Sequence, residues 1–263
     1  MTELLDQGAF LAARAWCAEA PVEVHEELPS TNDRLAQLAE EGAPEGTLVV
    51  AGSQTAGRGR HGRSWSSPEG GLYFSFLLRP DEAMLRRLAP TLVGGLAVCQ
   101  ALDGFTPEET RPQLKWPNDV LLDGRKVAGV LGEMTRGSDG YRLVLGLGIN
   151  LAAVEFPDDV SEIATSVAAT GACPEPTAFL AAFFESFTGL YRSVERGGGA
   201  LILAQASARM PSLGKPIRLH LANESVTGIF SGLSATGGLV LESEDGTQRN
   251  VHLAGEVEAV RPR

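Results

Sequence analysis

Apolar and polar positions alternate along the first hundred residues in patterns that predict helices and strands in turn. The expected helices cover residues 3–18, the stretch from Ser30 or Thr31 to Gly42, and residues 84–102. The expected strands cover residues 22–28, 47–54 and 72–78. Ser30 or Thr31 is a suitable helix N-cap and Gly42 a suitable end. Pro90 should interrupt or restart the third helix.

Residues 113–150 have the pattern of a β-meander. Asp123-Gly124 is a typical two-residue hairpin turn, and a looser turn is expected over residues 137–140. If Arg136 pairs with Tyr141, antiparallel counting places Gly129 opposite Gly148.

The first hairpin predicts a second register. If Leu122 pairs with Arg125, the same counting places Gly129 opposite Asn118.

Helices are expected over residues 178–194 and 199–210, followed by a junction rich in Pro and Gly near residue 211. Five short β-like runs then follow: 216–222, 225–232, 238–243, 247–253 and 256–260. Their close spacing fits a small SH3-like β-barrel. We therefore predict an α+β protein with a mixed or antiparallel sheet and flanking helices in residues 1–211, and a small barrel in residues 212–263.

Composition narrows the class of protein. The 263-residue chain is 43% hydrophobic and carries a net charge of −11, which argues against a general nucleic-acid binder with a basic surface. The acidic start is unlike a signal peptide, and the longest uncharged stretch, 88–102, is too short to span a membrane. Three widely spaced cysteines, Cys17, Cys99 and Cys173, favour a reducing compartment, so we expect a cytoplasmic location.

A loop of arginines and glycines, residues 57–63, stands out against this acidic background. Residues 46–68 contain three arginines and no acid, which favours a focused anion site such as a polyphosphate clamp. Residues 57–62 also fit the dinucleotide-binding pattern, but a strand-like run follows instead of a helix. A solvated loop and a short RNA-binding segment are the remaining alternatives.

Lysine is rare in this chain, with three among 22 basic residues. Lys115 and Lys126 lie in the predicted meander, which hints at a need for a compact, mobile ammonium group. Solvated lysines at strand ends are the alternative interpretation.

Glycines interrupt the same predicted strands. They are Gly129, Gly132, Gly146 and Gly148. Glycines inside strands often mark close approach by a ligand or another backbone, so the register above predicts a bare patch on the sheet. A bulge or a tight helix contact is the alternative.

Five motifs occur in an order that resembles biotin protein ligases. They are Ser30-Thr31-Asn32, Gln54 with residues 57–65, Lys115-Trp116-Pro117-Asn118-Asp119, residues 124–129 and residues 146–150. The resemblance implies a class II synthetase-like α+β catalytic domain followed by an SH3-like domain. It also implies ATP-dependent attachment of biotin to a lysine of a biotin carboxyl carrier protein, a subunit or domain of an acyl-CoA carboxylase.

The resemblance implies two sets of contacts. The biotin set is Ser30, Thr31, Asn32, Gln54, Gly57, Arg58, Gly59, Arg60 and Lys126, above a floor of Gly129, Gly146 and Gly148. The ATP or adenylate set is Arg58, Arg60, Arg63, Trp65, Lys115, Asn118, Lys126 and Asn150. His61 stands where many relatives have another arginine, which lowers the charge of the loop.

Joining a carboxylate to a phosphate requires a cation between the two anions. Lys126 is the first candidate and Lys115 the second, with Arg58, Arg60 and Arg63 neutralising the phosphates. No enzyme nucleophile is expected, because positioning and electrostatics suffice. The loop should be mobile when empty and close over the adenylate, excluding water.

Asp119 is either the acceptor for the proton of the incoming lysine or a structural turn carboxylate. Mg²⁺ is expected to accompany ATP on its phosphates and water, so we predict no metal-ligating side chains.

A lipoate or octanoate ligase of the same fold is the nearest alternative, although we find no signature motifs of those enzymes. A longer form of the family adds an N-terminal winged-helix domain and acts as a repressor. Because 21 residues precede the first predicted strand, we expect the enzyme-only form, with no DNA partner, as a monomer or weak homodimer.

Overall fold

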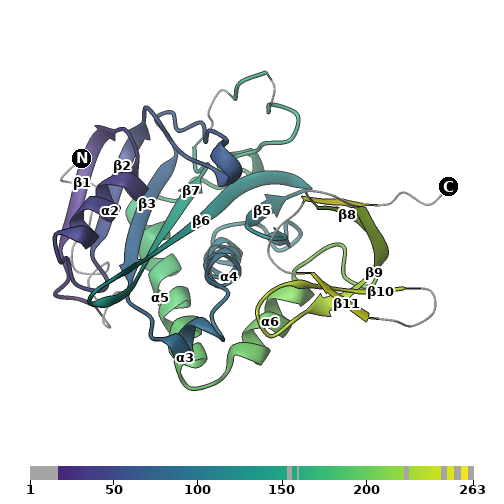
Figure 1. Ribbon diagram of the computed structural model, residues 1–263. Coiled ribbons are helices and arrows are strands. Elements are labelled where there is room, and N and C mark those ends of the chain that lie inside the picture. The colour runs from purple at the N-terminus through teal and green to yellow at the C-terminus, as the bar shows by residue number, and fades with distance from the viewer. Residues whose placement is uncertain are drawn as a thin grey trace.

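The computed structural model describes residues 17–152, 156–158, 160–221, 225–243, 248–251 and 256–259. A seven-stranded sheet forms the centre of the molecule (Figure 1). Its strands are β1 (Val22–Leu28), β2 (Leu48–Gln54), β3 (Leu72–Leu78), β4 (Gln113–Lys115), β5 (Asp119–Leu122), β6 (Arg125–Gly137) and β7 (Gly140–Ile149). They lie in the order β1-β2-β3-β7-β6-β5-β4, with β1 and β2 parallel and the other pairs antiparallel. The predicted mixed sheet is confirmed.

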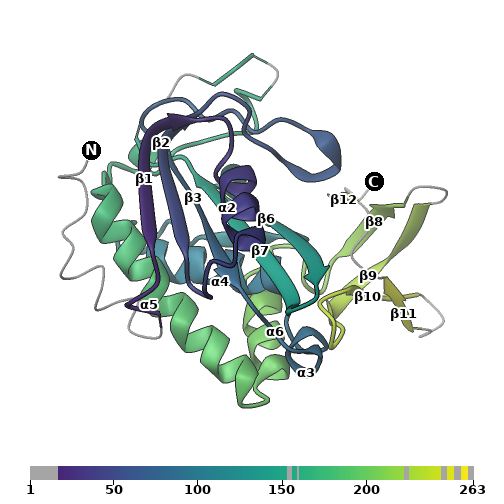
Figure 2. The same ribbon diagram turned by 60° about the vertical axis from the view of Figure 1, so that its left-hand side comes forward.

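The two faces of this sheet are covered by different helices (Figure 2). Along β3, Phe74 and Phe76 point to a large core shared with α4 (Pro90–Asp103) and α5 (Pro176–Glu195). Tyr73 and Leu77 point the other way, to a smaller cluster with α2 (Thr31–Glu40). This alternation follows from the two-residue period of a strand, and every residue of β3 is buried because both faces are covered.

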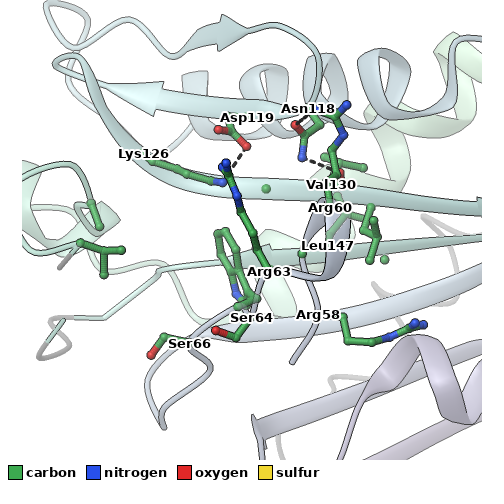
Figure 3. Close-up of a pocket in the computed structure, with 18 of the residues that line it drawn as sticks. Arg58, Arg60, Arg63, Ser64, Ser66, Asn118, Asp119, Lys126, Val130 and Leu147 are labelled. Carbon is green, nitrogen blue, oxygen red and sulfur yellow. Dashed lines mark hydrogen bonds and ion pairs between the residues drawn. The ribbon is translucent and has the colours of Figure 1, made fainter. Parts of the chain in front are cut away.

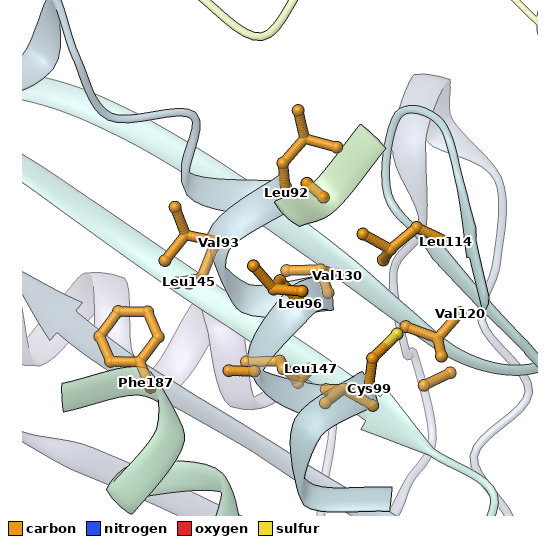
Figure 4. Packing of buried hydrophobic residues seen from close by; sticks show 14 of the residues in the cluster. Leu92, Val93, Leu96, Cys99, Leu114, Val120, Val130, Leu145, Leu147 and Phe187 are labelled. Carbon is orange, nitrogen blue, oxygen red and sulfur yellow. The ribbon is translucent and has the colours of Figure 1, made fainter. Parts of the chain in front are cut away.

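The large core gathers around α4, as Figure 4 shows. Leu92 and Leu96 on this helix and Val130 and Leu145 on the sheet are at most 2% exposed. Gly94 allows the helix to lie close to the sheet, since an added Cβ would come within 3.2 Å of Val130 Cγ1. Close packing of this kind fixes the positions of β6 and β7 relative to α4, and these two strands carry the predicted glycine patch.

Local signals explain where the helices begin. Ser30 caps α2 by accepting from the Asp33 amide, and Asp81 caps α3 (Glu82–Leu85) by accepting from the Met84 amide. Pro90 occupies the first turn of α4, where its missing N–H costs nothing. The expected interruption at Pro90 is therefore confirmed.

The C-terminal strands form a second, antiparallel sheet. Its strands are β8 (Pro216–His220), β9 (Ser225–Leu233), β10 (Leu239–Glu242), β11 (Gln248–Val251) and β12 (Glu256–Ala259), in the order β11-β10-β9-β8-β12. The five expected runs are thus five strands. Within the described residues no pairing joins the edge strands β11 and β12, so a closed barrel stays a prediction.

This second sheet is part of the same core as the first. Phe230, Leu239 and Leu241 belong to the cluster that contains α4, and α6 (Gly199–Ala208) lies beside β9 (Figure 1). The Leu114 amide on β4 donates to the carbonyl of Arg209, just after α6. The C-terminal sheet therefore lies against the β4 side of the central sheet.

The predicted registers can be compared with the structure. Gly129 does face Gly148, and Arg136 faces Tyr141, as expected. The prediction that Gly129 faces Asn118 is wrong, because Gly129 faces Asp119. A bulge in β6 adds one residue between the turn and Gly129, which shifts the pairing by one.

Three other expectations can be assessed. Residues 3–16 of the first expected helix lie outside the described residues. Cys17, Cys99 and Cys173 are thiols that form no disulfide with one another, and burial raises the pKa of the Cys99 thiol to about 12. Within the described part of the chain, no helix is both long and apolar enough to cross a bilayer.

The aromatic cluster under β3 provides a test of the fold. Phe183 on α5 is fully buried, with its ring centroid 5.1 Å from that of Phe74 and 6.0 Å from that of Phe76. Phe183→Ala should lower the free energy of unfolding by about 3–5 kcal/mol, measured by urea denaturation, because it leaves a cavity. Leu201→Ala on α6 is the control, since Leu201 is 61% exposed and should change stability by less than about 0.5 kcal/mol. Equal losses in both variants would contradict this packing.

Candidate active site

A cavity of about 440 Å³ opens on the α2 face of the central sheet (Figure 3). Its walls come from the start of α2, the end of β2, the loop of residues 58–66, the segment 115–119 between β4 and β5, and residues of the stretches 156–157 and 160–164. Strands β6 and β7 form its floor. This volume lies within the range of about 300–1,000 Å³ typical of small-molecule sites.

The arginine-glycine loop is a small hairpin whose two sides are joined by backbone hydrogen bonds. The Trp65 amide donates to the Gly57 carbonyl at 2.8 Å, and the Gly59 amide donates to the Arg63 carbonyl at 2.7 Å. At the tip, His61 and Gly62 both have positive φ, 56° and 74°. Glycine meets that requirement without strain, whereas His61 carries a side chain in a left-handed conformation.

Trp65 lies flat on the glycine floor. A Cβ at Gly148 would come within 2.3 Å of the indole Nε1, and a Cβ at Gly129 within 2.9 Å of Cζ3. Any side chain at either position would displace the ring. The indole Nε1 is buried and has no hydrogen-bond partner among the described residues. The bare patch predicted at Gly129 and Gly148 is therefore real, and it accommodates an aromatic ring. Gly132 is not part of it, because its Cβ would point to the α4 side of the sheet, toward Thr91 and Leu145.

The bulge in β6 brings Lys126 to the same face as Gly129. In a regular strand residues three apart point to opposite faces, but here Val127 and Ala128 both belong to the core. A Cβ on Gly129 would lie 3.4 Å from Lys126 Cε. The extra residue therefore turns the lysine into the cavity.

Two groups hold the Lys126 ammonium. Its Nζ lies 2.7 Å from Asp119 Oδ1, as an ion pair without the alignment of a hydrogen bond, and 4.8 Å from the centroid of the Trp65 ring. The side chain is 29% exposed, so the cation is partly desolvated but open to the cavity.

Uncharged polar groups surround the first turn of α2. The Thr31 amide donates to Gln54 Oε1 at 2.8 Å, and Gln54 Nε2 donates to Ser67 Oγ at 2.8 Å. Ser75 Oγ lies 2.7 Å from Thr31 Oγ1 and 2.6 Å from Asn32 Oδ1. Gly146 makes room for this network, because a Cβ there would fall 1.8 Å from Asn32 Oδ1. The network fixes the side chains at this end of the cavity.

The arginines of the loop differ in their surroundings. Arg58 is turned toward two carboxylates, Asp33 at 2.8 Å and Glu133, which also accepts from Asn32 Nδ2. Figure 3 shows its side chain directed away from Lys126 and Arg63. Arg60 Nη1 lies 3.4 Å from Asn118 Oδ1, across the cavity mouth. All three loop arginines line the cavity, but Arg58 is held by carboxylates on the α2 side while Arg60 lies at the mouth.

Asn150 holds the remaining wall in place. Its Nδ2 donates to the Thr165 carbonyl at 2.9 Å, and its amide donates to Val127. The Lys126 amide donates to Ile163, while the Thr165 amide donates to Lys126. Residues 163–165 are thereby fastened to the strand that carries the lysine.

The structure brings most of the predicted site residues together. The following line the cavity: Ser30, Thr31, Asn32, Gln54, Arg58, Gly59, Arg60, Arg63, Trp65, Lys115, Asn118, Asp119, Lys126, Gly129, Gly146, Gly148 and Asn150. Gly57 does not line it. An added Cβ at Gly57 would meet Trp65 O at 2.5 Å and Ser67 Oγ at 2.6 Å, so this glycine closes the base of the hairpin instead.

The sequence interpretation missed several residues of the site. Glu133 lies on the same face of β6 as Gly129 and Leu131, because these residues are separated by steps of two. The two-residue period of a strand could therefore have identified Glu133. Ser75 is the one small polar residue in the apolar run of β3, which is also a signal. Ile163 and Ala164 carried no sequence signal, because they reach the site by pairing with Lys126.

Comparison with known proteins places this architecture in a class of acid-activating ligases. Residues 24–150 match the family model described as "Biotin/lipoate A/B protein ligase family", and residues 212–258 match "Biotin protein ligase C terminal domain". The chain is 35% identical over 224 residues to the Biotin--[acetyl-CoA-carboxylase] ligase of Paracoccus denitrificans, covering 83% of this chain and 93% of that one.

Two further comparisons agree. The chain is 35% identical over 230 residues to the Bifunctional ligase/repressor BirA of Bacillus subtilis, covering 86% of this chain and 70% of that one. Its structure resembles that of the biotin protein ligase from Aquifex aeolicus in complex with biotin and ATP, with a TM-score of 0.76, 34% identity, and coverage of 92% and 99%. The chain therefore belongs to the biotin protein ligase family, a family of ligase enzymes.

Gly148→Ala tests the glycine floor. The new methyl group should displace the Trp65 ring, so tryptophan emission should become more accessible to acrylamide quenching, and stability should fall by about 1–3 kcal/mol. Gly132→Ala is the matched control, because its Cβ would meet neighbours at 3.6 Å or more. Unchanged quenching in Gly148→Ala would show that the ring does not rest on this floor.

Proposed function

We propose that this protein joins biotin to AMP at the expense of ATP and then transfers the biotinyl group to a lysine of a biotin carboxyl carrier protein. One observation carries the proposal. A single cavity holds an uncharged polar end beside α2, a lysine at its floor and a loop of arginines at its mouth. This is the arrangement that a neutral ring system, a carboxylate and a polyphosphate require in sequence along one pocket.

The uncharged end suits the ring system of biotin. A cyclic urea offers two N–H donors and one carbonyl acceptor, and the hydroxyl and amide groups of Ser30, Thr31 and Gln54 can match them. Ser30 and Thr31 are at most 4% exposed, so these contacts would be made out of water. A fixed polar site of this kind rejects an acid whose distal end lacks the matching groups.

Lys126 suits the reacting end. Two unit negative charges about 4 Å apart repel by about 4 kcal/mol at an effective dielectric constant of 20, so a cation between carboxylate and α-phosphate lowers the barrier directly. When the anions enter, the ammonium would exchange its contact with Asp119 for them. The loop arginines and Lys115 would neutralise the remaining phosphate charge.

Mg²⁺ would accompany ATP chiefly on phosphate oxygens and water. The donor set fits this role, because the cavity carboxylate of Asp119 already faces Lys126 and the loop that lines the cavity carries arginines. When bound, the metal would neutralise part of the phosphate charge, and the cationic side chains of the cavity would neutralise the rest.

In the second step the acceptor lysine attacks the mixed anhydride as a neutral amine. Asp119 lies beside the reacting end and could accept the released proton once Lys126 has moved to the anions. AMP then leaves with the phosphate that had activated the acid. The alternative role, a turn carboxylate that only orients Lys126, predicts the same geometry and a smaller effect of Asp119→Asn on transfer.

Several further assignments belong to this proposal. We place the catalytic unit in residues 1–211 and an SH3-like unit in residues 212–263, supported by the C-terminal family match. The acceptor is a carboxylase subunit, by analogy with the relatives' names. We also propose a cytoplasmic protein without a DNA partner, supported by three cysteines outside disulfide bonds and a net charge of −11. We propose that it is a monomer or weak homodimer.

The identity of the acid is tested by ATP–pyrophosphate exchange with purified protein. Biotin should support exchange, whereas lipoate and octanoate should not. Exchange with lipoate or octanoate and none with biotin would replace this proposal by a lipoate-type ligase. A positive result is completed by transfer of biotin to a purified carrier domain.

Lys126→Ala should reduce biotin-dependent exchange by a factor on the order of 100 to 1,000, because it removes the cation at the reacting centre. Lys215→Ala provides the control, since Lys215 is exposed near the start of the C-terminal sheet. Near-normal exchange by Lys126→Ala would eliminate its catalytic role.

Arg60→Gly should weaken retention of the adenylate, because the arginine lies across the cavity mouth from Asn118. The released adenylate should biotinylate lysines of an unrelated protein such as serum albumin, detected by avidin blotting. Arg111→Gly, in an exposed loop, is the matched control and should label no bystander. Intact activity without bystander labelling would contradict the assigned role of Arg60.

A further inference from the structure

We infer that Trp116 is a positioning residue through which the C-terminal sheet holds the nucleotide end of the cavity. The inference rests on the proposed function for the identity of the ligand at that end. It assigns the second sheet a role in ATP binding that is exerted through one side chain and one turn, without contact between that turn and the nucleotide.

Trp116 connects the two sheets directly. Its backbone belongs to the segment 115–119 that walls the cavity, yet its side chain is only 4% exposed. The indole Nε1 donates to the carbonyl of Gly237, 121 residues away, at 3.0 Å. A buried indole N–H needs a partner, and here the partner comes from the turn between β9 and β10.

The turn that receives this hydrogen bond is closed by three hydrogen bonds of its own. The Ser234 amide donates to Gly238, the Gly237 amide donates to Ser234, and the Gly238 amide donates to Ser234 Oγ at 3.1 Å. Gly237 has φ of +81°, and a Cβ there would lie 2.7 Å from Ala89 Cβ and 3.0 Å from Leu92 Cδ1. Glycine is thus required both by the backbone and by contact with α4.

Other contacts hold the same cavity segment from the first sheet. Thr91 Oγ1 on α4 donates to the Pro117 carbonyl at 3.1 Å. Asn118 Nδ2 donates to the Val130 carbonyl at 3.0 Å, and the Val130 amide donates back to Asn118. Trp116 therefore supplies the tether that belongs to the C-terminal sheet.

This geometry predicts an effect on one end of the cavity. Lys115 directly precedes Trp116 and Asn118 follows it by two positions, and Asn118 faces Arg60. The polar end beside α2 is built from residues of α2, β2 and β3, none of which is in the segment 115–119. Loss of the tether should weaken nucleotide binding and leave biotin binding unchanged.

Trp116→Phe removes the N–H donor and retains an aromatic ring. The dissociation constant for Mg-ATP, measured by titration calorimetry, and the KM for ATP in exchange should each rise roughly three- to tenfold, the effect of one buried hydrogen bond. The dissociation constant for biotin should stay within about twofold. Tyr191→Phe is the control for loss of a buried aromatic hydrogen bond, here the one to Glu45.

Gly237→Ala provides a second test, since Gly237 accepts the hydrogen bond from Trp116. The added methyl group should push the turn from α4 and raise the same two constants. Gly214→Ala is its matched control, because Gly214 also has a positive φ, +73°, but an added Cβ would meet nothing within 4 Å. Gly214→Ala should bind Mg-ATP as the wild type does.

The outcomes separate the inference from the proposed function. Weaker Mg-ATP binding in Trp116→Phe and Gly237→Ala, with biotin binding retained, supports the inference even if the wild type catalyses no exchange. Unchanged Mg-ATP binding in Trp116→Phe overturns the inference. It is also overturned if biotin affinity falls as much as ATP affinity, or if the two control variants lose as much Mg-ATP affinity as the test variants. A wild type that binds neither ligand contradicts both.

Discussion

Two neighbouring strands lack side chains at the point where they face each other, and the site depends on that gap. Gly129 and Gly148 leave a bare area on β6 and β7 over which the Trp65 indole lies. The same ring carries the Lys126 ammonium 4.8 Å above its centroid. Because Trp65 also closes the arginine hairpin through its amide, the floor, the lysine and the loop are fixed relative to one another. Removing the gap at either glycine would move all three.

Charge balance explains how an acidic protein prepares a site for anions. Lys126 faces Asp119, and Arg58 faces Asp33 and Glu133, so these cations have partners before any ligand enters. A partly buried cation without a partner would be costly, and a carboxylate offsets that cost while leaving the group available for exchange. An entering carboxylate or phosphate then competes with a protein carboxylate for the same donors. Because the chain as a whole carries a net charge of −11, anions are attracted to the cavity and its loop and not to the protein surface in general.

Much of the fold and of the site could be predicted from the sequence, and the exceptions have physical reasons. Strand periodicity and turn residues located the strands closely, and antiparallel counting placed Gly129 opposite Gly148. The same counting failed at Asn118, because a bulge cannot be read from hydrophobic pattern alone. That bulge also turns Lys126 into the cavity, so the lysine was identified without its geometric cause. The contact between Trp116 and Gly237 joins positions 121 apart and left no local signal.

The central claim is that one cavity brings a carboxylate and a polyphosphate together against Lys126 and the arginine loop. Native mass spectrometry of the protein after incubation with biotin and Mg-ATP, without any acceptor, tests this most directly. The account predicts one equivalent of biotinyl-AMP retained per chain and pyrophosphate in solution. Biotin and ATP bound side by side without condensation, or an adenylate recovered only in free solution, would contradict it.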